Sequence, residues 1–134
     1  VALNITANWH LIRLMGPLLR KSPAGRAVFL TSGVAHMGRA YWGPYAMSKA
    51  ALEVLAQTFA AETTSTNVRV NLFGPGPTRT QMYAAAFPGI DPMTLPTPEE
   101  VAEKIVPLCL PDFTESGKLY DYRSGTLKSF RAPS

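Results

Sequence analysis

Apolar residues in the first part of the chain recur at the spacing of an amphipathic helix. Between residues 3 and 19 they stand three or four positions apart, the period that places side chains on one helix face. These residues are Leu3, Ala7, Leu11, Leu14, Met15 and Leu18. Proline and glycine within residues 22–25 predict where this helix ends.

Three short runs have the pattern of strands. Residues 26–32 form an apolar run without alternation, which is typical of a strand buried on both faces of a parallel sheet. Residues 68–73 form the next candidate, and the glycines and prolines of residues 74–77 end it. Residues 118–122 form the third.

A loop and a second helix are predicted between the first two of these runs. Residues 33–44 contain several glycines and predict the loop, and the helical pattern resumes over residues 45–63. The positions expected to pack against the sheet are Ala46, Leu52, Leu55, Ala56 and Phe59.

A third helix is predicted from a start signal at Thr97, where Glu100 completes a capping box, and Pro107 kinks or ends it. Helices that alternate with strands imply right-handed crossovers and a parallel sheet. We therefore predict an α/β fold, a three-strand piece of a doubly wound parallel sheet with flanking helices. The chemistry of such sheets lies beyond the carboxyl ends of the strands, here residues 31–45, residues 73–96 and residue 123 onward.

The composition is that of a globular chain. Of 134 residues, 46% are hydrophobic and 16% are charged, which argues against a disordered protein. No run approaches the 18 apolar residues of a membrane span, and the first residues do not resemble a signal peptide. The single cysteine, Cys109, excludes a disulfide framework, and His10 and His36 have no neighbours to complete a metal site. We expect a cytoplasmic protein with no metal and no membrane partner.

The net charge of +4 is unevenly distributed. Residues 1–52 carry six lysines and arginines and no acidic residue, whereas residues 53–134 carry seven basic and nine acidic residues. A basic segment can attract nucleic acid or a phosphate-bearing cofactor, but no nucleic-acid-binding motif accompanies it, and no such partner is expected. We favour the interpretation that the balancing acidic residues lie on a part of the parent protein that this chain does not contain.

Candidate chemistry is concentrated at the start of the second predicted helix. Tyr45 and Lys49 stand four residues apart and share one helix face. An ammonium beside a phenol favours the phenolate, which makes a tyrosine usable as an acid or base near neutrality. Ser32, thirteen residues before Tyr45, would project into the same crevice, where its hydroxyl can donate to a carbonyl oxygen. The same residues also fit a structural interpretation, an exposed tyrosine packed on a lysine stem and a serine that caps a strand end.

With their neighbours, these residues resemble the catalytic core of the short-chain dehydrogenase/reductase family. The similar stretches are residues 31–35, 45–52, 68–71 and 75–82, in the family's order and spacing. Asn4, 28 residues before Ser32, falls where the family keeps a helical asparagine that holds a relay water. The resemblance implies a Rossmann-like fold, NAD or NADP as cofactor, and hydride transfer between that cofactor and a small-molecule carbonyl or alcohol.

The resemblance also implies a role for each matching residue. Tyr45 is the counterpart of the general acid or base, and Lys49 supports it and binds the nicotinamide ribose. Ser32 corresponds to the donor to the substrate oxygen, and Asn4 to the proton relay. The residues expected to bind the cofactor are Tyr45, Lys49, Pro75, Gly76, Thr78 and Thr80. Asn71 corresponds to a structural bridge between backbone segments.

The resemblance covers nearly all of residues 1–123 but only the second half of the family's fold. The glycine-rich turn that packs the pyrophosphate against a helix N-terminus has no counterpart, and neither has the residue that separates NAD from NADP. We expect residues 1–134 to be the C-terminal catalytic part of one Rossmann-like NAD(P)-binding domain whose N-terminal half is missing. As an isolated fragment, the chain is expected to be inactive.

Two other functions stay open at this point, a non-catalytic nucleotide-binding or regulatory relative and an extended-type epimerase or dehydratase. The set Asn4, Ser32, Tyr45 and Lys49 favours an enzyme, because a binding module needs no proton relay. The resemblance further implies that residues 80–96 close over the substrate. It also implies that the first two helices pair across a dimer axis, so the intact parent is expected to be a homodimer or homotetramer.

Overall fold

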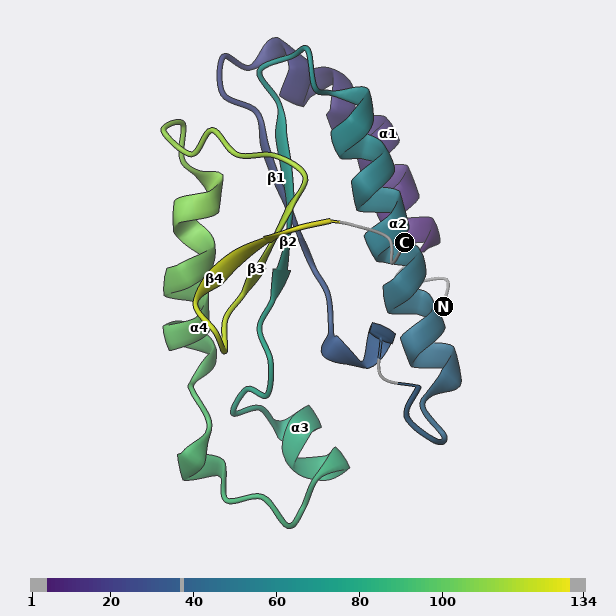
Figure 1. The fold of residues 1–134 in the computed structure, drawn as a ribbon, viewed down its shortest axis with the longest axis vertical. Helices are drawn as coiled ribbons and strands as arrows, with labels where there is room; N and C mark the ends of the chain where they lie inside the picture. Colours follow the sequence, from purple (N-terminus) through teal and green to yellow (C-terminus); the bar gives the residue numbers. More distant parts are fainter. Residues whose placement is uncertain (1–4, 37, 131–134) are drawn as a thin grey trace.

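A computed structural model describes residues 5–36 and 38–130 of the chain. In it, one four-stranded sheet lies between helices that cover both of its faces (Figure 1). The longer elements are α1 (Thr6–Lys21), β1 (Arg26–Leu30), α2 (Gly43–Glu62), β2 (Arg69–Gly74), α4 (Pro98–Ile105), β3 (Lys118–Asp121) and β4 (Thr126–Ser129). The short ones are η1 (Gly33–His36), α3 (Gln81–Ala86), η2 (Pro92–Thr94) and η3 (Val106–Cys109).

The strands lie in the order β1-β2-β3-β4. β1 and β3 pair with β2 in parallel, with Ala27 opposite Val70 and Leu72 opposite Leu119. These three strands and the helices between them confirm the predicted α/β fold. β4 pairs with β3 in the antiparallel direction and was not predicted, because its four residues are all exposed and too few to show a clear alternation.

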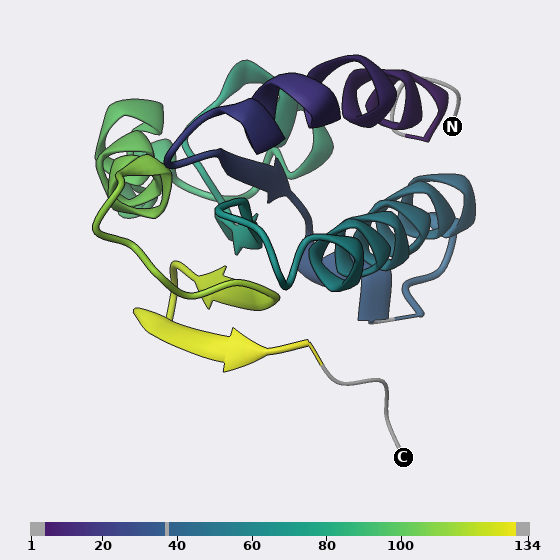
Figure 2. The same cartoon turned by 90° about the horizontal axis from the view of Figure 1, so that it is seen from above.

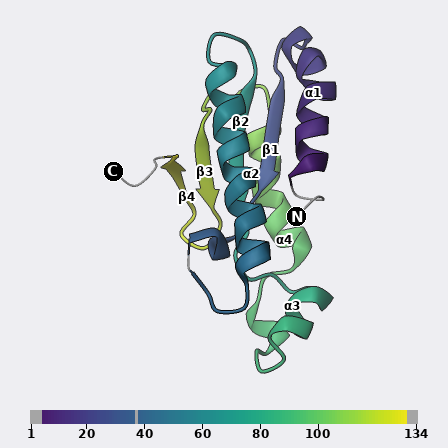
Figure 3. The ribbon, with the colours of Figure 1, turned by 90° about the vertical axis from the view of Figure 1, so that its right-hand side faces the viewer.

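Helices α1 and α2 cover one face of the sheet and α4 covers the other (Figures 2 and 3). The α2 side buries the cluster Phe59, Ala60, Val68 and Val70, and the α4 side buries the cluster Phe73, Val101 and Leu108. Successive residues of a strand point to opposite faces, so Phe29 of β1 joins the first cluster and Val28 joins the second. Three of the five packing positions predicted on α2, namely Leu52, Ala56 and Phe59, are buried.

The predicted apolar face of α1 is not the face that packs on the sheet. Leu11, Leu14 and Met15 are exposed, Leu14 to 71%, as is Leu18, whereas Ile12 and Leu19 pack on the α2-side cluster. The helix has apolar residues on more than one side, and spacing alone did not distinguish them. The prediction that the first strand is buried on both faces holds only in part, because Phe29 and Val28 pack on the two clusters but are only partly buried. β1 lies at the end of the strand order, and its Leu30 is 48% exposed.

Local signals explain where the helices begin and end. Gly25 directly follows the turn after α1, and a side chain there would come within 2.5 Å of the Leu19 carbonyl oxygen. Thr97 Oγ1 accepts a hydrogen bond from the Glu100 backbone N–H at 3.2 Å, which confirms the predicted N-cap of α4. α4 ends two residues before Pro107, as predicted. No helix of the described residues is long and apolar enough to cross a membrane.

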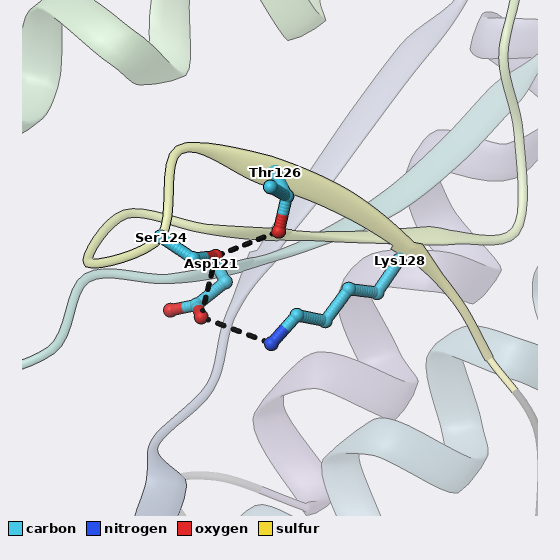
Figure 4. Close-up of polar contacts among 4 residues, drawn as sticks. All are labelled: Asp121, Ser124, Thr126 and Lys128. Carbon is cyan, nitrogen blue, oxygen red and sulfur yellow. Dashed lines mark hydrogen bonds and ion pairs between the residues drawn. The ribbon is translucent and has the colours of Figure 1, made fainter.

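A polar network closes the hairpin between β3 and β4 (Figure 4). Ser124 Oγ donates to Asp121 Oδ2 at 2.9 Å, and Lys128 Nζ donates to the same oxygen at 3.1 Å. The hydroxyl oxygens of Ser124 and Thr126 are hydrogen-bonded at 2.6 Å. Burial raises the pKa of Asp121, but the bonds from Lys128 and Ser124 outweigh it, so the pKa lies below its ordinary value. Gly125 adopts a φ of +65°, which allows the tight turn.

Asn71 joins β2 to the segment that leads into β3. Its side chain is fully buried, its Nδ2 donates to the Glu115 carbonyl at 3.0 Å, and its Oδ1 accepts from the Lys118 N–H at 3.1 Å. These two bonds confirm that Asn71 is a structural bridge between backbone segments.

We expect Asn71→Ala to destabilise a full-length protein that contains this chain by about 2 kcal/mol or more. The substitution leaves two backbone groups without a partner, and each costs about 1–3 kcal/mol where it is kept from water. Urea unfolding followed by circular dichroism measures the change. The control is Asn67→Ala, at an exposed position, which should change stability by less than about 0.5 kcal/mol. Equal effects of the two substitutions would contradict the bridging role.

Candidate active site

The carboxyl ends of β1 and β2 face the end of the molecule where α2 begins and α3 lies (Figure 1). Residues 31–45 and 74–96 connect to these strand ends, as the predicted topology requires. This end of the sheet holds the described candidate residues.

Tyr45 and Lys49 share one face of the first turns of α2. The Lys49 ammonium lies 5.8 Å from the centroid of the Tyr45 ring, within the range of a cation–π contact. Lys49 Nζ also donates to the Leu30 carbonyl at 3.3 Å, so it reaches from the helix to the end of β1. Burial lowers the pKa of Lys49 from its ordinary value. Tyr45 is 37% exposed and is accessible to a ligand.

Ser32 lies two residues beyond β1, directly before the short helix η1. Its backbone carbonyl accepts from the Ala35 N–H at 3.1 Å and so opens that turn. Its neighbour Thr31 is anchored on two sides. The Thr31 N–H donates to the Phe73 carbonyl at 2.9 Å, and Thr31 Oγ1 donates to Glu53 Oε1 at 2.5 Å. The segment that carries Ser32 is thereby joined to both β2 and α2.

The loop after β2 turns at Gly76, with a φ of +67° that favours glycine. A side chain at this position would also come within 2.9 Å of Arg123 Cγ. A residue other than glycine at position 76 would therefore strain this turn.

Thr78 and Thr80 continue this loop toward α3. Thr78 Oγ1 donates to the Gly76 carbonyl at 3.1 Å, and Thr80 Oγ1 accepts from the Tyr83 N–H at 3.0 Å as the N-cap of α3. Both threonines thus have local structural partners, and the capping hydroxyl of Thr80 still carries its own proton as a donor.

An aromatic cluster joins α3 to the start of α2. The Trp42 ring stacks on the Phe87 ring, with 5.7 Å between ring centroids, and meets the Tyr45 ring edge-on at 5.9 Å. The centroid of the Tyr83 ring lies 4.7 Å from that of Phe87. The Arg39 guanidinium lies over both Phe87 and Trp42, at 4.6 and 5.3 Å. α3 is therefore held beside Tyr45 by ring contacts between segments about 45 residues apart.

Arg79 supports the loop that follows α3. Its Nε donates to the Pro92 carbonyl at 2.9 Å and its Nη2 to the Leu95 carbonyl at 3.0 Å. A hollow of about 260 Å³ opens nearby, lined by Pro77, Thr94, Leu95, Pro96, Tyr122 and Arg123. It lies below the size range of about 300–1,000 Å³ that is usual for ligand pockets.

Asn4 lies outside the described residues. Among residues 5–36 and 38–130, no group of three or more His, Cys, Asp or Glu side chains is placed to hold a metal ion.

A sequence profile of the short chain dehydrogenases matches residues 1–91, more than half of the chain. The chain belongs to the short chain dehydrogenase family. Its Rossmann-like sheet and the order of its strands agree with that membership.

Individual family members agree over most of the chain. An uncharacterised oxidoreductase of Escherichia coli K12, YciK, is 47% identical over 98 residues, which cover 73% of this chain and 38% of YciK. A short chain dehydrogenase of Salmonella enterica serovar Typhi superposes with a TM-score of 0.84 and 41% identity, over 90% of this chain and 50% of the other.

Solved family members carry a nicotinamide cofactor. A short chain dehydrogenase of Escherichia coli CFT073, solved as a complex with NADPH, superposes with a TM-score of 0.82 and 40% identity, over 90% of this chain and 50% of that protein. The chain therefore spans about half the length of the solved family members that it matches, and less of YciK.

Sequence reasoning missed two features of the site. The aromatic cluster was missed because Trp42 and Phe87 are distant in sequence and carry no shared motif. The hydrogen bond between Thr31 and Glu53 was also missed. One weak indication of it was present in the sequence, because Glu53 is an acidic residue among the packing positions Leu52 and Ala56 of the second helix.

We expect Lys49→Met to leave a full-length protein that contains this chain as stable as before or more stable in the absence of ligands. The lowered pKa means that folding disfavours the charged Lys49, and methionine removes this cost while keeping an apolar stem. The cost is present at neutral pH and is relieved as pH rises through the lowered pKa toward 10.5, so the advantage of methionine should shrink over that range.

Thermal unfolding of the parent protein and the Lys49→Met variant, measured from about pH 7 to about pH 10, tests this expectation. The range ends there because the ordinary lysine pKa is 10.5. Lys104→Met, at an exposed position of α4, is the control and should show no such pH trend. A clear loss of stability in Lys49→Met at neutral pH would show instead that the bond to Leu30 outweighs the burial cost.

Proposed function

We propose that a protein containing this chain is an NAD(P)-dependent oxidoreductase that interconverts a small-molecule carbonyl and alcohol. The observation that carries the proposal is the pair Tyr45 and Lys49, in contact on one helix face beside the segment of Ser32, in a short chain dehydrogenase. NADPH in the solved E. coli family member supports the choice of cofactor class.

The residues at this end fit a nicotinamide dinucleotide in their chemistry. An ammonium has three N–H donors, and within the described residues Lys49 uses one of them, toward Leu30. The Thr80 hydroxyl can also donate, and Gly76 presents its backbone without a side chain of its own, next to the stem of Arg123. We propose that Lys49 holds the ribose hydroxyls and that Pro75, Gly76, Thr78 and Thr80 hold the nicotinamide carboxamide and its neighbourhood.

The proposed reaction needs a proton at the substrate oxygen. When bound, the nicotinamide cofactor supplies or accepts the hydride. Tyr45 Oη donates the proton to the oxygen during carbonyl reduction and removes it during alcohol oxidation. Lys49 places its ammonium 5.8 Å from the centroid of the Tyr45 ring, on the same helix face as the proposed proton donor.

Two further residues complete the proposed proton path. Ser32 Oγ donates a hydrogen bond to the substrate oxygen and stabilises the charge that develops there. Asn4 holds the water that reconnects Tyr45 to solvent. Residues 80–96, which include α3, then cover the substrate, and the ring contacts of Trp42 hold this cover beside Tyr45.

We also propose that residues 1–134 are the catalytic part of a larger cofactor-binding domain that associates with a second copy. The exposed apolar residues of α1 and α2 support this proposal, since such faces mark interaction surfaces. They are Trp9, Leu11, Leu14, Met15, Leu18, Met47 and Val54.

In a full-length protein that contains this chain, Tyr45→Phe should lower kcat about 10²- to 10⁴-fold, the usual contribution of a general acid. The phenylalanine keeps the ring, so cofactor affinity should change little. Steady-state kinetics with a panel of carbonyl and alcohol substrates, and cofactor titration, measure both values. The control is Tyr41→Phe at a fully exposed tyrosine, which should leave kcat unchanged. Normal turnover in Tyr45→Phe would favour a non-catalytic relative of the family.

Residues 1–134 expressed alone should bind NAD, NADH, NADP and NADPH negligibly and catalyse no hydride transfer. The chain lacks the glycine-rich turn that holds the pyrophosphate. The open edge of β1 and the exposed apolar residues of α1 should also make it associate. Calorimetric titration and light-scattering mass measurement test this. A monodisperse monomer that binds any of the four cofactor forms with a Kd of about 10⁻⁶ M, equivalent to about −8 kcal/mol, would contradict it.

A further inference from the structure

The bond between Thr31 and Glu53 is buried and lies outside the residues assigned above. Each side chain is only 6% exposed, and Thr31 Oγ1 donates to Glu53 Oε1 at 2.5 Å. A buried carboxylate is costly unless it is hydrogen-bonded, and Glu53 stands between Leu52 and Ala56 on the inner face of α2. An apolar pair could fill the same space, so the polar pair indicates a requirement for a directional contact.

The bond joins the two parts of the proposed active site. Thr31 directly precedes Ser32, and Glu53 lies one helical turn after Lys49 and two turns after Tyr45. The hydrogen bond from Lys49 to the Leu30 carbonyl also connects α2 with the end of β1, one residue before Thr31. The Thr31 N–H donates to the Phe73 carbonyl of β2. The strand-end segment is thus tied to α2 by two side chains and to β2 by its backbone.

We propose that Glu53 is a positioning residue that acts through Thr31 to set the place of the Ser32 hydroxyl relative to Tyr45. This inference rests on the function proposed above. A hydrogen bond holds its two atoms at a narrowly defined distance, whereas an apolar contact would let the strand end slide along the helix. Misplacement of a reacting group by about 1 Å can cost about 10²-fold in rate, so catalysis is sensitive to this bond.

Thr31 offers the cleanest variants. Thr31→Val keeps the shape of the side chain and removes the hydroxyl, and Thr31→Ser keeps the hydroxyl. In a full-length protein that contains this chain, Thr31→Val should lower kcat about 10- to 100-fold, with the dissociation constant of the cofactor unchanged. Thr31→Ser should restore most of the loss. Thermal unfolding, measured on each variant, separates lost rate from lost folded protein.

The double variant shows whether the effect passes through Ser32. Ser32→Ala alone should lower kcat about 10²- to 10³-fold, as loss of an oxyanion donor does. Thr31→Val added to Ser32→Ala should then lower kcat no further, because the group that it positions is gone. A merely structural Thr31 would lower stability in both backgrounds and leave kcat per folded molecule unchanged.

Glu53→Gln is the second variant, for use if Thr31→Val does not fold. Its amide oxygen can still accept the Thr31 bond, so it should retain most of the rate, whereas Glu53→Leu should lose as much as Thr31→Val. The inference is overturned if Thr31→Val and Glu53→Leu both keep the parent kcat, or if Thr31→Val is fully additive with Ser32→Ala. In those cases, loss of activity in Tyr45→Phe would leave the proposed function standing. Full activity in both Tyr45→Phe and Ser32→Ala would overturn function and inference together.

Discussion

Strand β2 is the element on which the rest of the structure depends. It pairs with β1 on one side and β3 on the other, and both of its faces are covered, so Val70, Leu72 and Phe73 have almost no exposure. A strand in this position must satisfy all its backbone groups through its neighbours, because water does not reach it. The register of β1 and β3 is therefore set by β2, and with it the place where each strand ends and the candidate site begins.

The opposite end of the sheet is held by two arginines that lie side by side. Arg26 and Arg69 are opposite each other in the register of β1 and β2, a pairing of like charges that costs free energy on its own. Each guanidinium donates to backbone carbonyls instead, Arg26 to Leu110 and Pro111 and Arg69 to Thr114. These bonds fasten the connection between α4 and β3 across the amino ends of the strands, at the end of the sheet opposite the candidate site.

Buried polar side chains join separate elements of the fold through hydrogen bonds. The side chain of Asn71 in β2 bonds to the backbone of the segment that leads into β3. At the candidate site, the bond between Thr31 and Glu53 connects the end of β1 with α2. Directional bonds of this kind define the arrangement of elements more sharply than apolar contacts, which can adapt to small shifts. The proposed proton donors therefore stand on parts of the molecule that are fixed relative to one another.

The sequence by itself determined the α/β class, the three parallel strands, the N-cap at Thr97 and the contact of Tyr45 with Lys49, because each depends on local periodicity or on spacing within one element. Tertiary structure alone decided which side of α1 meets the sheet, the added strand β4, the stacking of Trp42 on Phe87 and the pairing of Thr31 with Glu53. These features join residues from different elements. Local sequence carries the period of each helix and strand, but the rotation and placement of one element against another depend on how all of them pack together.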